Sequence, residues 1–202
     1  REQALDREYA ELASRMLRDA RQREEDADVA ALDRLVADAQ KEDARLGYQL
    51  GQQRMAKRTS ADLADAQRFF REAIDLDPQF ALAYVGLADS LTLYVRHSGA
   101  PKESGLRNAE KSVTEALELD PTLAEAWASS GLIAYYRGQY DRGESMFRRA
   151  IELNPNYAPA RHWYSSTLAN VGRRDEARAQ IQRAAELDPL STMIKVNLAA
   201  SL

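Results

Sequence analysis

The sequence predicts an all-α fold, a right-handed solenoid of helix–turn–helix units, from two observations. A six-residue string recurs four times: Ala-Ile-Asp-Leu-Asp-Pro, Ala-Leu-Glu-Leu-Asp-Pro, Ala-Ile-Glu-Leu-Asn-Pro and Ala-Ala-Glu-Leu-Asp-Pro. Its prolines are Pro78, Pro121, Pro155 and Pro189, so the last two intervals are equal and the first is longer by nine. A 34-residue period of this kind is typical of paired helices that bury their apolar faces only by stacking on neighbouring pairs.

The segment 1–46 differs from the rest of the chain. It holds 22 charged residues with a net charge of −4 and has neither glycine nor proline. We interpret it as a charged helical hairpin, a degenerate repeat that caps the array, with an acidic turn at 24–28. A coiled-coil or linker helix is the alternative. The two apolar stripes of the expected hairpin are Leu5, Tyr9, Leu12, Met16 and Ala20, and then Val29, Leu32, Val36 and Ala39.

Residues 47–202 form the predicted repeat array. Its units are 47–80, 81–123, 124–157 and 158–191, followed by a partial unit at 192–202, and we expect the sequence to be a piece of a longer protein. The unit at 47–80 carries Arg54 at the eighth position, where the other units have a small residue. The unit at 81–123 contains the nine extra residues, and we expect the insertion at 96–105 to be a surface loop between helices, near the rim of the groove.

The unit at 124–157 shows why particular residues are needed. We expect Gly131 and Gly143 to allow close approach where the two helices cross, and Gly138 to end the first helix in a left-handed conformation. Trp127 and Phe147 provide apolar bulk between repeats. Replacement of Gly131 by leucine is therefore expected to overpack the crossing.

This arrangement of aromatic, small and proline positions on a regular period resembles the tetratricopeptide repeat family over residues 47–202. The stretches 58–63 (Arg-Thr-Ser-Ala-Asp-Leu), 80–90 and 154–164 are similar to repeat arrays attached to bacterial adenylyl cyclases, winged-helix transcription regulators and Ser/Thr kinases. The resemblance implies a scaffold or sensor that binds other proteins. It also implies a concave groove lined by the first helix of each pair.

We therefore place the candidate binding residues in this groove. The groove is apolar and rich in tyrosine, which suits an amphipathic helix or an extended peptide, and we expect Tyr135 and Tyr136 to be its anchors. The paired Lys and Asn with which some tetratricopeptide domains hold a chaperone's carboxylate are not matched. The candidates are Tyr48, Met55, Arg58, Leu82, Val85, Asp89, Thr92, Leu132, Tyr135, Tyr136, His162, Ser166 and Asn170.

Enzymatic and metal-binding motifs are absent from the sequence. The two histidines, His97 and His162, are far apart and lack neighbouring ligands at metal-binding spacing, and there is no cysteine. We therefore expect no enzyme, no metal and no cofactor. Outside residues 1–46 the acidic and basic residues balance, which argues against nucleic-acid binding. No apolar run is long enough for membrane insertion, so we expect a soluble protein, cytoplasmic or periplasmic.

These observations predict a protein–protein interaction scaffold or regulatory segment that holds a protein or peptide ligand in the concave groove. Two alternatives stay open. The chain could be a self-association module that forms a homo-oligomer, or a sensor region that regulates an attached catalytic or DNA-binding domain.

Overall fold

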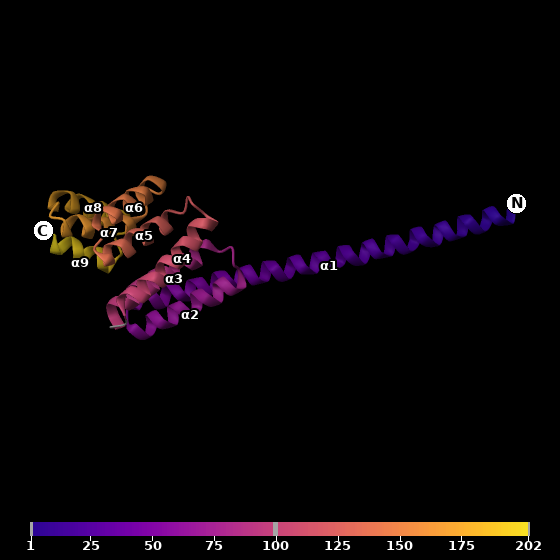
Figure 1. Cartoon of the computed structure of the whole chain (residues 1–202), viewed down its shortest axis with the longest axis horizontal. Helices are drawn as coiled ribbons and strands as arrows, with labels where there is room; N and C mark the ends of the chain where they lie inside the picture. Colours follow the sequence, from indigo (N-terminus) through magenta and orange to yellow (C-terminus); the bar gives the residue numbers. More distant parts are fainter. Residues whose placement is uncertain (1, 99–100, 202) are drawn as a thin grey trace. The chain divides into compact units, whose positions relative to one another are not determined.

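The computed structural model describes the backbone of residues 2–98 and 101–201. In the first helix it describes the side chains of residues 15, 16, 18, 19, 21–23 and from 26 onward. These residues form helices and no strand, so the predicted all-α class is confirmed (Figure 1). The chain divides into two units, Arg1–Asp43 and Ala44–Leu202. The second unit contains the repeats.

The predicted hairpin at 1–46 is wrong, because one helix, α1, runs without interruption from Glu2 to Lys57. The acidic residues at 24–28 lie inside this helix rather than in a turn, since no glycine or proline there interrupts helical hydrogen bonding. Of the second apolar stripe, Val29, Leu32 and Val36 are 59%, 61% and 50% exposed. In the first stripe only the side chain of Met16 is described, and it is also exposed.

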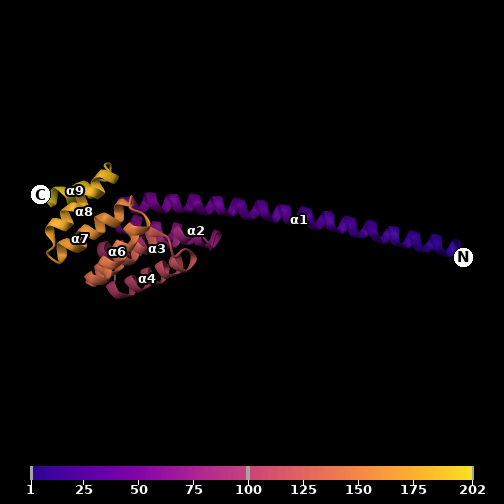
Figure 2. The ribbon, with the colours of Figure 1, turned by 90° about the horizontal axis from the view of Figure 1, so that it is seen from above.

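The second unit is an α-solenoid in which consecutive helices pack in chain order (Figure 2). Its helix pairs are α3 with α4, α5 with α6 and α7 with α8, while α2 packs on α3 and α9 packs on α8. The first helices of successive pairs also touch, α3 on α5 and α5 on α7. The bounds of the helices after α1 are α2 Ser60–Leu76, α3 Ala81–Ser98, α4 Lys102–Leu119, α5 Ala124–Arg137, α6 Tyr140–Leu153, α7 Ala158–Asn170, α8 Arg174–Leu187 and α9 Thr192–Ala200.

The recurring Asp-Pro or Asn-Pro string ends the second helix of each pair. Its acidic or amide side chain accepts a hydrogen bond from the backbone N–H two residues later, as in Thr122 N to Asp120 Oδ1 (2.8 Å). The same bond is made at Asp77 (3.1 Å), Asn154 (3.1 Å) and Asp188 (3.3 Å). The side chain therefore stabilises the turn that leads into the next repeat.

Equivalent positions of the second helices form the core between the layers. The bulky position is Phe70, Val113, Phe147 and Ile181, and each of these side chains is at most 3% exposed. The small position three residues later is Ala73, Ala116, Ala150 and Ala184, and each is fully buried. A small residue lets the next repeat approach closely, while the bulky one fills the space between helices.

The first repeat has a different register from the one we predicted. Ala44 is fully buried, and the span from Ala44 to Lys57 has the same 14-residue length as α5. The eighth residue of this span is Gly51, and a Cβ atom there would lie 2.6 Å from the Phe70 ring. Gly51, not Arg54, is thus the small residue at the helix crossing. The three-residue difference lies in α2, which has 17 residues against 14 in α6, while the turn after α1 is as short as the turn after α5. Arg58 takes the place of Gly138 and Gly172, with φ +58° against +76° and +84°.

The insertion at 96–105 is not a surface loop, because most of it is helical. Helices α3 and α4 have 18 residues each, against 14 in α5 and α6. Residues 96–98 end α3, and residues 102–105 begin α4 after Pro101. Gly105 permits this close pairing, because a Cβ atom there would overlap Val95 Cγ2. The insertion therefore lengthens one helix pair instead of forming a separate feature.

Candidate functional site

The predicted binding residues lie mostly on the first helices of the pairs. We call this surface, formed by residues 44–57 of α1 and by α3, α5, α7 and α9, the first-helix face. The candidates that are partly buried or exposed on this face, with Arg58 directly after it in the chain, are Tyr48, Met55, Arg58, Leu82, Asp89, Tyr135, Tyr136, Ser166 and Asn170.

Four candidates are buried instead. Val85 is 4% exposed and Leu132 is 3% exposed, and each belongs to an apolar core between helices. Thr92 is 1% exposed, and its hydroxyl donates to the Ala88 carbonyl within α3 (2.8 Å). His162 is 4% exposed. Helix period alone does not separate inward from outward positions here, because the first helices are packed on several sides.

Asp89 is the centre of a polar group on this face. Its Oδ1 accepts a hydrogen bond from Ser129 Oγ (2.6 Å), which joins α3 to α5. Burial raises the pKa of the Asp89 carboxyl to about 6, against the lowering effects of Ser129 and the positive charge of Arg58. Burial also raises the pKa of Tyr157 well above its ordinary value, and the negative charges of Asp89 and Glu125 add to that shift.

His162 joins α7 to α9. Its Nε2 lies 2.5 Å from Asn197 Nδ2, and its ring lies against Trp163 with centroids 4.8 Å apart. Burial and, to a smaller extent, the positive charge of Arg58 together lower the pKa of His162 to about 4. The imidazole is therefore neutral at pH 7 and accepts the hydrogen bond from the amide of Asn197.

The two tyrosines predicted as anchors have different environments. The Tyr135 hydroxyl accepts a hydrogen bond from Asn170 Nδ2 (3.2 Å), and its ring lies near those of Tyr140 and Trp163. Tyr136 packs against two core clusters, and its hydroxyl is buried with no hydrogen-bond partner among the described residues. The Tyr135 hydroxyl thus lies at the surface, whereas Tyr136 is mainly a packing residue.

A hollow of about 300 Å³ adjoins Tyr135 and Asn170. Its lining combines hydroxyl and amide side chains with small apolar ones, contributed by helices α5, α7, α8 and α9. Such side chains both donate and accept hydrogen bonds, as the backbone of an extended peptide requires. The polar lining residues are Tyr135, Ser165, Ser166, Asn170, Asn197 and Ser201.

Several residues of this face were missed from the sequence. Gln52 donates to the Tyr48 hydroxyl (2.9 Å), and it becomes recognisable only once the first helix is counted from Ala44. Ser129 and Tyr157 lie outside the positions that usually line the groove. Asn197 belongs to the partial repeat, where a count of one repeat period from His162 gives Val196 rather than Asn197.

Comparison with known proteins identifies the repeats. A family model described as tetratricopeptide repeat matches residues 134–201. Residues 134–201 thus carry tetratricopeptide repeats. A thermophilic tetratricopeptide-repeat protein of Thermus thermophilus has the same fold, with a TM-score of 0.67 and 20% identity over 79% of this chain and 81% of that one. Pseudomonas aeruginosa PilF aligns with a TM-score of 0.59 and 17% identity, over 81% of this chain and 69% of that one.

Curated relatives share the repeats at low identity. Transcriptional regulator HilA of Salmonella typhimurium is 24% identical over 147 residues, which are 73% of this chain and 27% of that protein. Anaphase-promoting complex subunit 3 of Schizosaccharomyces pombe is 27% identical over 61% of this chain and 17% of its own length. Hsp70-Hsp90 organizing protein 2 of Arabidopsis thaliana is 30% identical over 46% of this chain and 14% of its own length. The chain thus spans about a quarter or less of these relatives.

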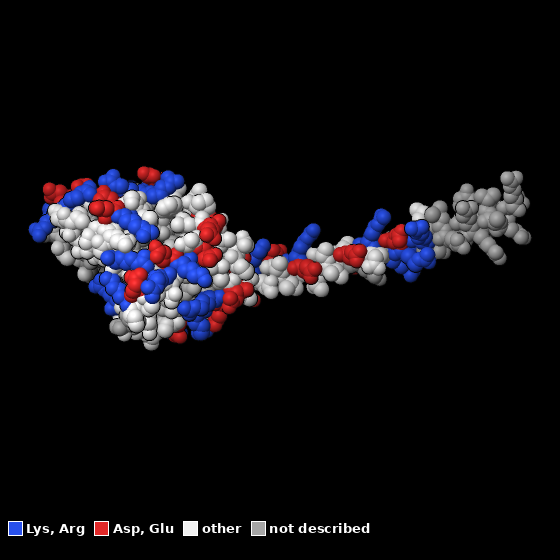
Figure 3. All heavy atoms as spheres, viewed as in Figure 1, with Lys and Arg blue, Asp and Glu red and all other residues white. Residues whose placement is uncertain are grey.

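Proteins with tetratricopeptide repeats generally mediate protein–protein interactions and are generally not catalytic. In this tetratricopeptide array, the described residues contain no cluster of side chains that could hold a metal ion. Among the same residues, no helix combines the length and apolar character needed to cross a membrane. On the face drawn in Figure 3, Lys and Arg side chains alternate with Asp and Glu over the repeats rather than gathering into one basic patch.

Proposed function

We propose that the first-helix face holds an extended peptide of a partner protein, with Tyr135 and Asn170 as its main contacts. The observation that carries this proposal is the hydrogen-bonded pair Tyr135–Asn170 at the edge of the 300 Å³ hollow. A tyrosine ring supplies contact area at little entropic cost, and an asparagine amide can bond to both groups of a peptide backbone. Elsewhere in the array, Asp89, Glu125 and Arg58 supply charges that can select among longer peptides.

The experiment that tests this proposal is site-directed photocrosslinking. A photoreactive benzoylphenylalanine replaces Tyr135 in one variant and Arg149, exposed on α6, in the control variant. Each variant is irradiated in native-source extract, and crosslinked segments are identified by mass spectrometry. We expect a partner segment that crosslinks from position 135 and not from position 149.

The crosslinked segment is then synthesised and its affinity is measured by fluorescence anisotropy. We expect the double variant Tyr135→Ala/Asn170→Ala to bind it at least tenfold more weakly than wild type, while Arg149→Ala binds it equally well. Equal affinity of the double variant and wild type, with an unchanged circular dichroism spectrum, would place the ligand elsewhere and refute the proposal.

Self-association is a second candidate function, and exposed side chains of α1 favour it. Val29, Leu32 and Val36 are spaced by three and four residues, the spacing of a coiled-coil seam, and all are at least half exposed. Light scattering on Leu32→Glu/Val36→Glu tests it. A wild-type chain that is monomeric at all concentrations would exclude this function.

Regulation of an attached domain is a third candidate. It is supported by the 24% identity with transcriptional regulator HilA over 73% of this chain. The full open reading frame tests this candidate directly, since a regulatory array must be followed or preceded by the domain that it controls, and a frame without such a domain would exclude it.

A further inference from the structure

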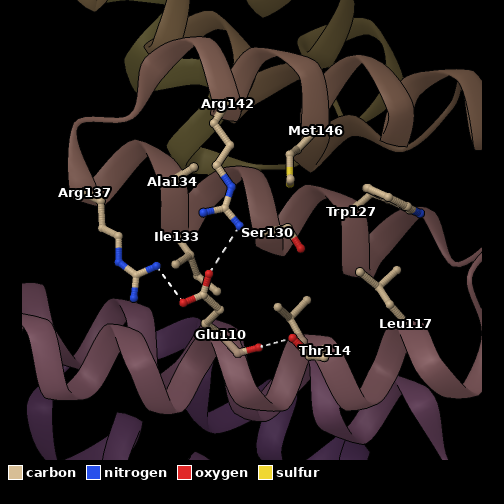
Figure 4. Close-up of a pocket in the computed structure, with 11 residues that line it drawn as sticks. Glu110, Thr114, Leu117, Trp127, Ser130, Ile133, Ala134, Arg137, Arg142 and Met146 are labelled. Atoms are coloured by element: carbon tan, nitrogen blue, oxygen red, sulfur yellow. Dashed lines mark hydrogen bonds and ion pairs between the residues drawn. The ribbon is translucent and has the colours of Figure 1, made fainter.

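A second concave feature lies away from the first-helix face, between the second helices α4 and α6. It is a cavity of about 230 Å³ with α5 as its floor, and we call it the α4–α6 slot (Figure 4). Its apolar wall contains side chains from all three helices. They are Val113, Leu117, Trp127, Ile133 and Met146.

One end of the slot is charged. Arg137 Nη1 donates to Glu110 Oε2 (2.7 Å), and Arg142 Nη2 lies 3.3 Å from Glu110 Oε1. Figure 4 shows both guanidinium groups converging on this carboxylate, with Trp127 and Met146 on the opposite side. The Arg137 side chain is only 12% exposed, and its Nε–H is buried without a hydrogen-bond partner among the described residues.

An open hollow of about 580 Å³ continues from this charged end. It shares Glu110, Arg137 and Arg142 with the slot and adds Lys102, Glu103, Arg107 and Gln139. Four cationic side chains therefore face two carboxylates. Lys102 and Arg107 are exposed and make no ion pair with any residue that the structure describes. Lys102 and Glu103 belong to the first turn of α4, which is present only because the insertion lengthens this helix.

A hollow also lies between α2 and α4 over α3, so the lining rather than the position distinguishes the α4–α6 slot, and the next repeat differs from it at two lining positions. Arg161 lies one repeat period after Trp127, and Gln180 lies one repeat period after Met146. There Arg161 Nη1 donates to Gln180 Oε1 (3.0 Å) and its Nη2 donates to the Pro155 carbonyl (3.2 Å), so polar bonds join the two side chains. Trp127 Nε1 likewise donates to the Pro121 carbonyl (2.9 Å), but Trp127 and Met146 form no side-chain hydrogen bond with each other and both line the slot.

We propose that the α4–α6 slot binds a segment of a partner protein in which one large apolar side chain is followed by acidic residues. Dry apolar cavities of about 150 Å³ already hold a benzene ring, so the slot has room for a phenylalanine or leucine side chain. The acidic residues then lie over the adjoining hollow, where the excess of two positive charges attracts them. This site is independent of the first-helix face.

The probe is a fluorescein-labelled peptide, Gly-Ser-Phe-Glu-Asp-Glu-Ser-Gly, and its binding to the whole chain is measured by anisotropy. Two control peptides replace the phenylalanine by serine, or the three acidic residues by their amides. We expect the parent peptide to bind at least tenfold more tightly than either control, and its affinity to fall as salt is raised. Equal binding of the three peptides, or no binding of the parent peptide, would overturn the proposal.

Two double variants separate the contributions of the apolar wall and of the cationic side chains to peptide binding. Trp127→Arg/Met146→Gln copies the pair of the next repeat, so it replaces two apolar lining residues by polar ones that the fold already accommodates at the equivalent positions. Lys102→Ala/Arg107→Ala removes the unpaired cations at exposed positions. Each is expected to weaken binding of the parent peptide at least tenfold, while Lys111→Ala, an exposed cation on α4 that lines a different hollow, leaves binding unchanged.

An unchanged affinity in either double variant, with the circular dichroism spectrum of wild type, would overturn the proposal. A further peptide covers residues 24–43 of this chain, which are acidic and contain Leu32. If this peptide bound more tightly than the parent probe and lost affinity in both double variants, the occupant would be a second copy of the chain, and the proposed partner segment would be wrong.

Discussion

Asp89 is held in the folded protein with a pKa of about 6, against an ordinary value of 3.8. The unfolded chain therefore releases this proton at lower pH than the folded protein does, so the contribution of Asp89 to stability falls as pH rises from about 4 to 6. We expect Asp89→Asn to stabilise the fold by about 1–3 kcal/mol at pH 7, because the amide has no charge to desolvate and still accepts from Ser129. Urea unfolding at pH 7 and pH 4, followed by circular dichroism, measures this difference, which should shrink at pH 4.

The pH dependence of the contribution that His162 makes to stability has the opposite sign. It therefore provides a control for the measurement on Asp89. Its pKa is lowered from 6.5 to about 4, so the folded protein resists protonation and loses stability as pH falls through this range. In the Asp89→Asn variant the acid sensitivity of His162 is no longer opposed, and its stability should fall more steeply below pH 6 than that of wild type. A variant with the same pH profile as wild type would contradict the burial of the Asp89 charge.

Arg58 occupies a left-handed backbone conformation that glycine occupies in two later repeats. A side chain with Cβ in this conformation costs about 1 kcal/mol relative to glycine. We expect Arg58→Gly to be more stable than Arg58→Ala by about this amount. Both variants remove the charge felt by Asp89 and His162, so the comparison isolates the backbone effect. Thermal unfolding of the pair measures it, and equal melting temperatures would refute the strain.

At the scale of helices, the crossing of α5 and α6 depends on one close contact. A Cβ atom on Gly131 would lie 2.7–2.9 Å from three carbons of the Phe147 ring. Gly131→Ala is therefore expected to destabilise the protein by about 1–3 kcal/mol through overpacking, and Gly131→Leu by at least as much. The measurement is the free energy of unfolding in urea.

Two further variants distinguish overpacking from an effect on helix propensity, since alanine is the better helix former. Phe147→Leu removes ring atoms from the contact, so Gly131→Ala should cost less in that background than in wild type. Gly138→Ala is the matched control, because its position has open space but φ +76°. Its cost should be the same with Phe147 or Leu at position 147. If the costs of Gly131→Ala and Phe147→Leu simply add in the double variant, Gly131 and Phe147 do not form the close contact at the crossing of α5 and α6.

Carboxylates at one repeat position join neighbouring helix pairs. Glu110 bonds to Arg137 and Arg142 of the next repeat, and Glu144 bonds to Arg173 of the repeat after that (2.6 Å). The equivalent residue of the first repeat is Gln67, whose Nε2 is buried without a partner among the described residues. The equivalent residue of the last full repeat is Arg178, which donates to the Ser201 carbonyl (2.8 Å), so the carboxylate linkage belongs to the second and third repeats only.

The sequence predicts some helix boundaries and core positions better than others, because the local signals that mark them differ in strength. The Asp-Pro strings and the residues at Phe147, Ala150 and their equivalents specify packing through short-range chemistry, and their burial was predicted correctly. The first repeat was misaligned by three residues because Arg58 stands where glycine normally marks the end of the first helix. The insertion was mistaken for a loop because a period shows that residues are added but not whether they continue a helix.

The candidate site was harder to predict than the fold for a physical reason. The sequence places residues on the first helices but does not show which of them a neighbouring repeat covers. Thr92 and Leu132 were chosen by position and are buried, whereas Tyr135 and Asn170 lie at the surface and bond to each other across α5 and α7. Bonds between repeats, such as Ser129 to Asp89, depend on stacking geometry that no single repeat contains.

At the scale of the whole array, every extensive contact among the described helices joins helices of the same repeat or of adjacent repeats. Helix α3 touches α2, α4 and α5, while α7 touches α5, α6 and α8. Stability should therefore be a sum of local and nearest-neighbour contributions, and damage should spread only to adjacent repeats. Ile181→Ala, at a side chain 2% exposed in α8, is expected to cost about 2–5 kcal/mol locally.

Native-state hydrogen exchange measures the local stability of each helix, so it shows how far the damage spreads. Ile181→Ala should accelerate amide exchange in α7, α8 and α9 and leave α2 and α3 close to wild type. Val113→Ala, at the equivalent position in α4, is the reciprocal variant and should act on α3, α4 and α5 instead. A uniform acceleration of all helices in either variant would mean that the repeats unfold as one cooperative unit. In that case a ligand on the first-helix face would also stabilise the distant α4–α6 slot, whereas nearest-neighbour coupling limits its effect to the repeats that it touches.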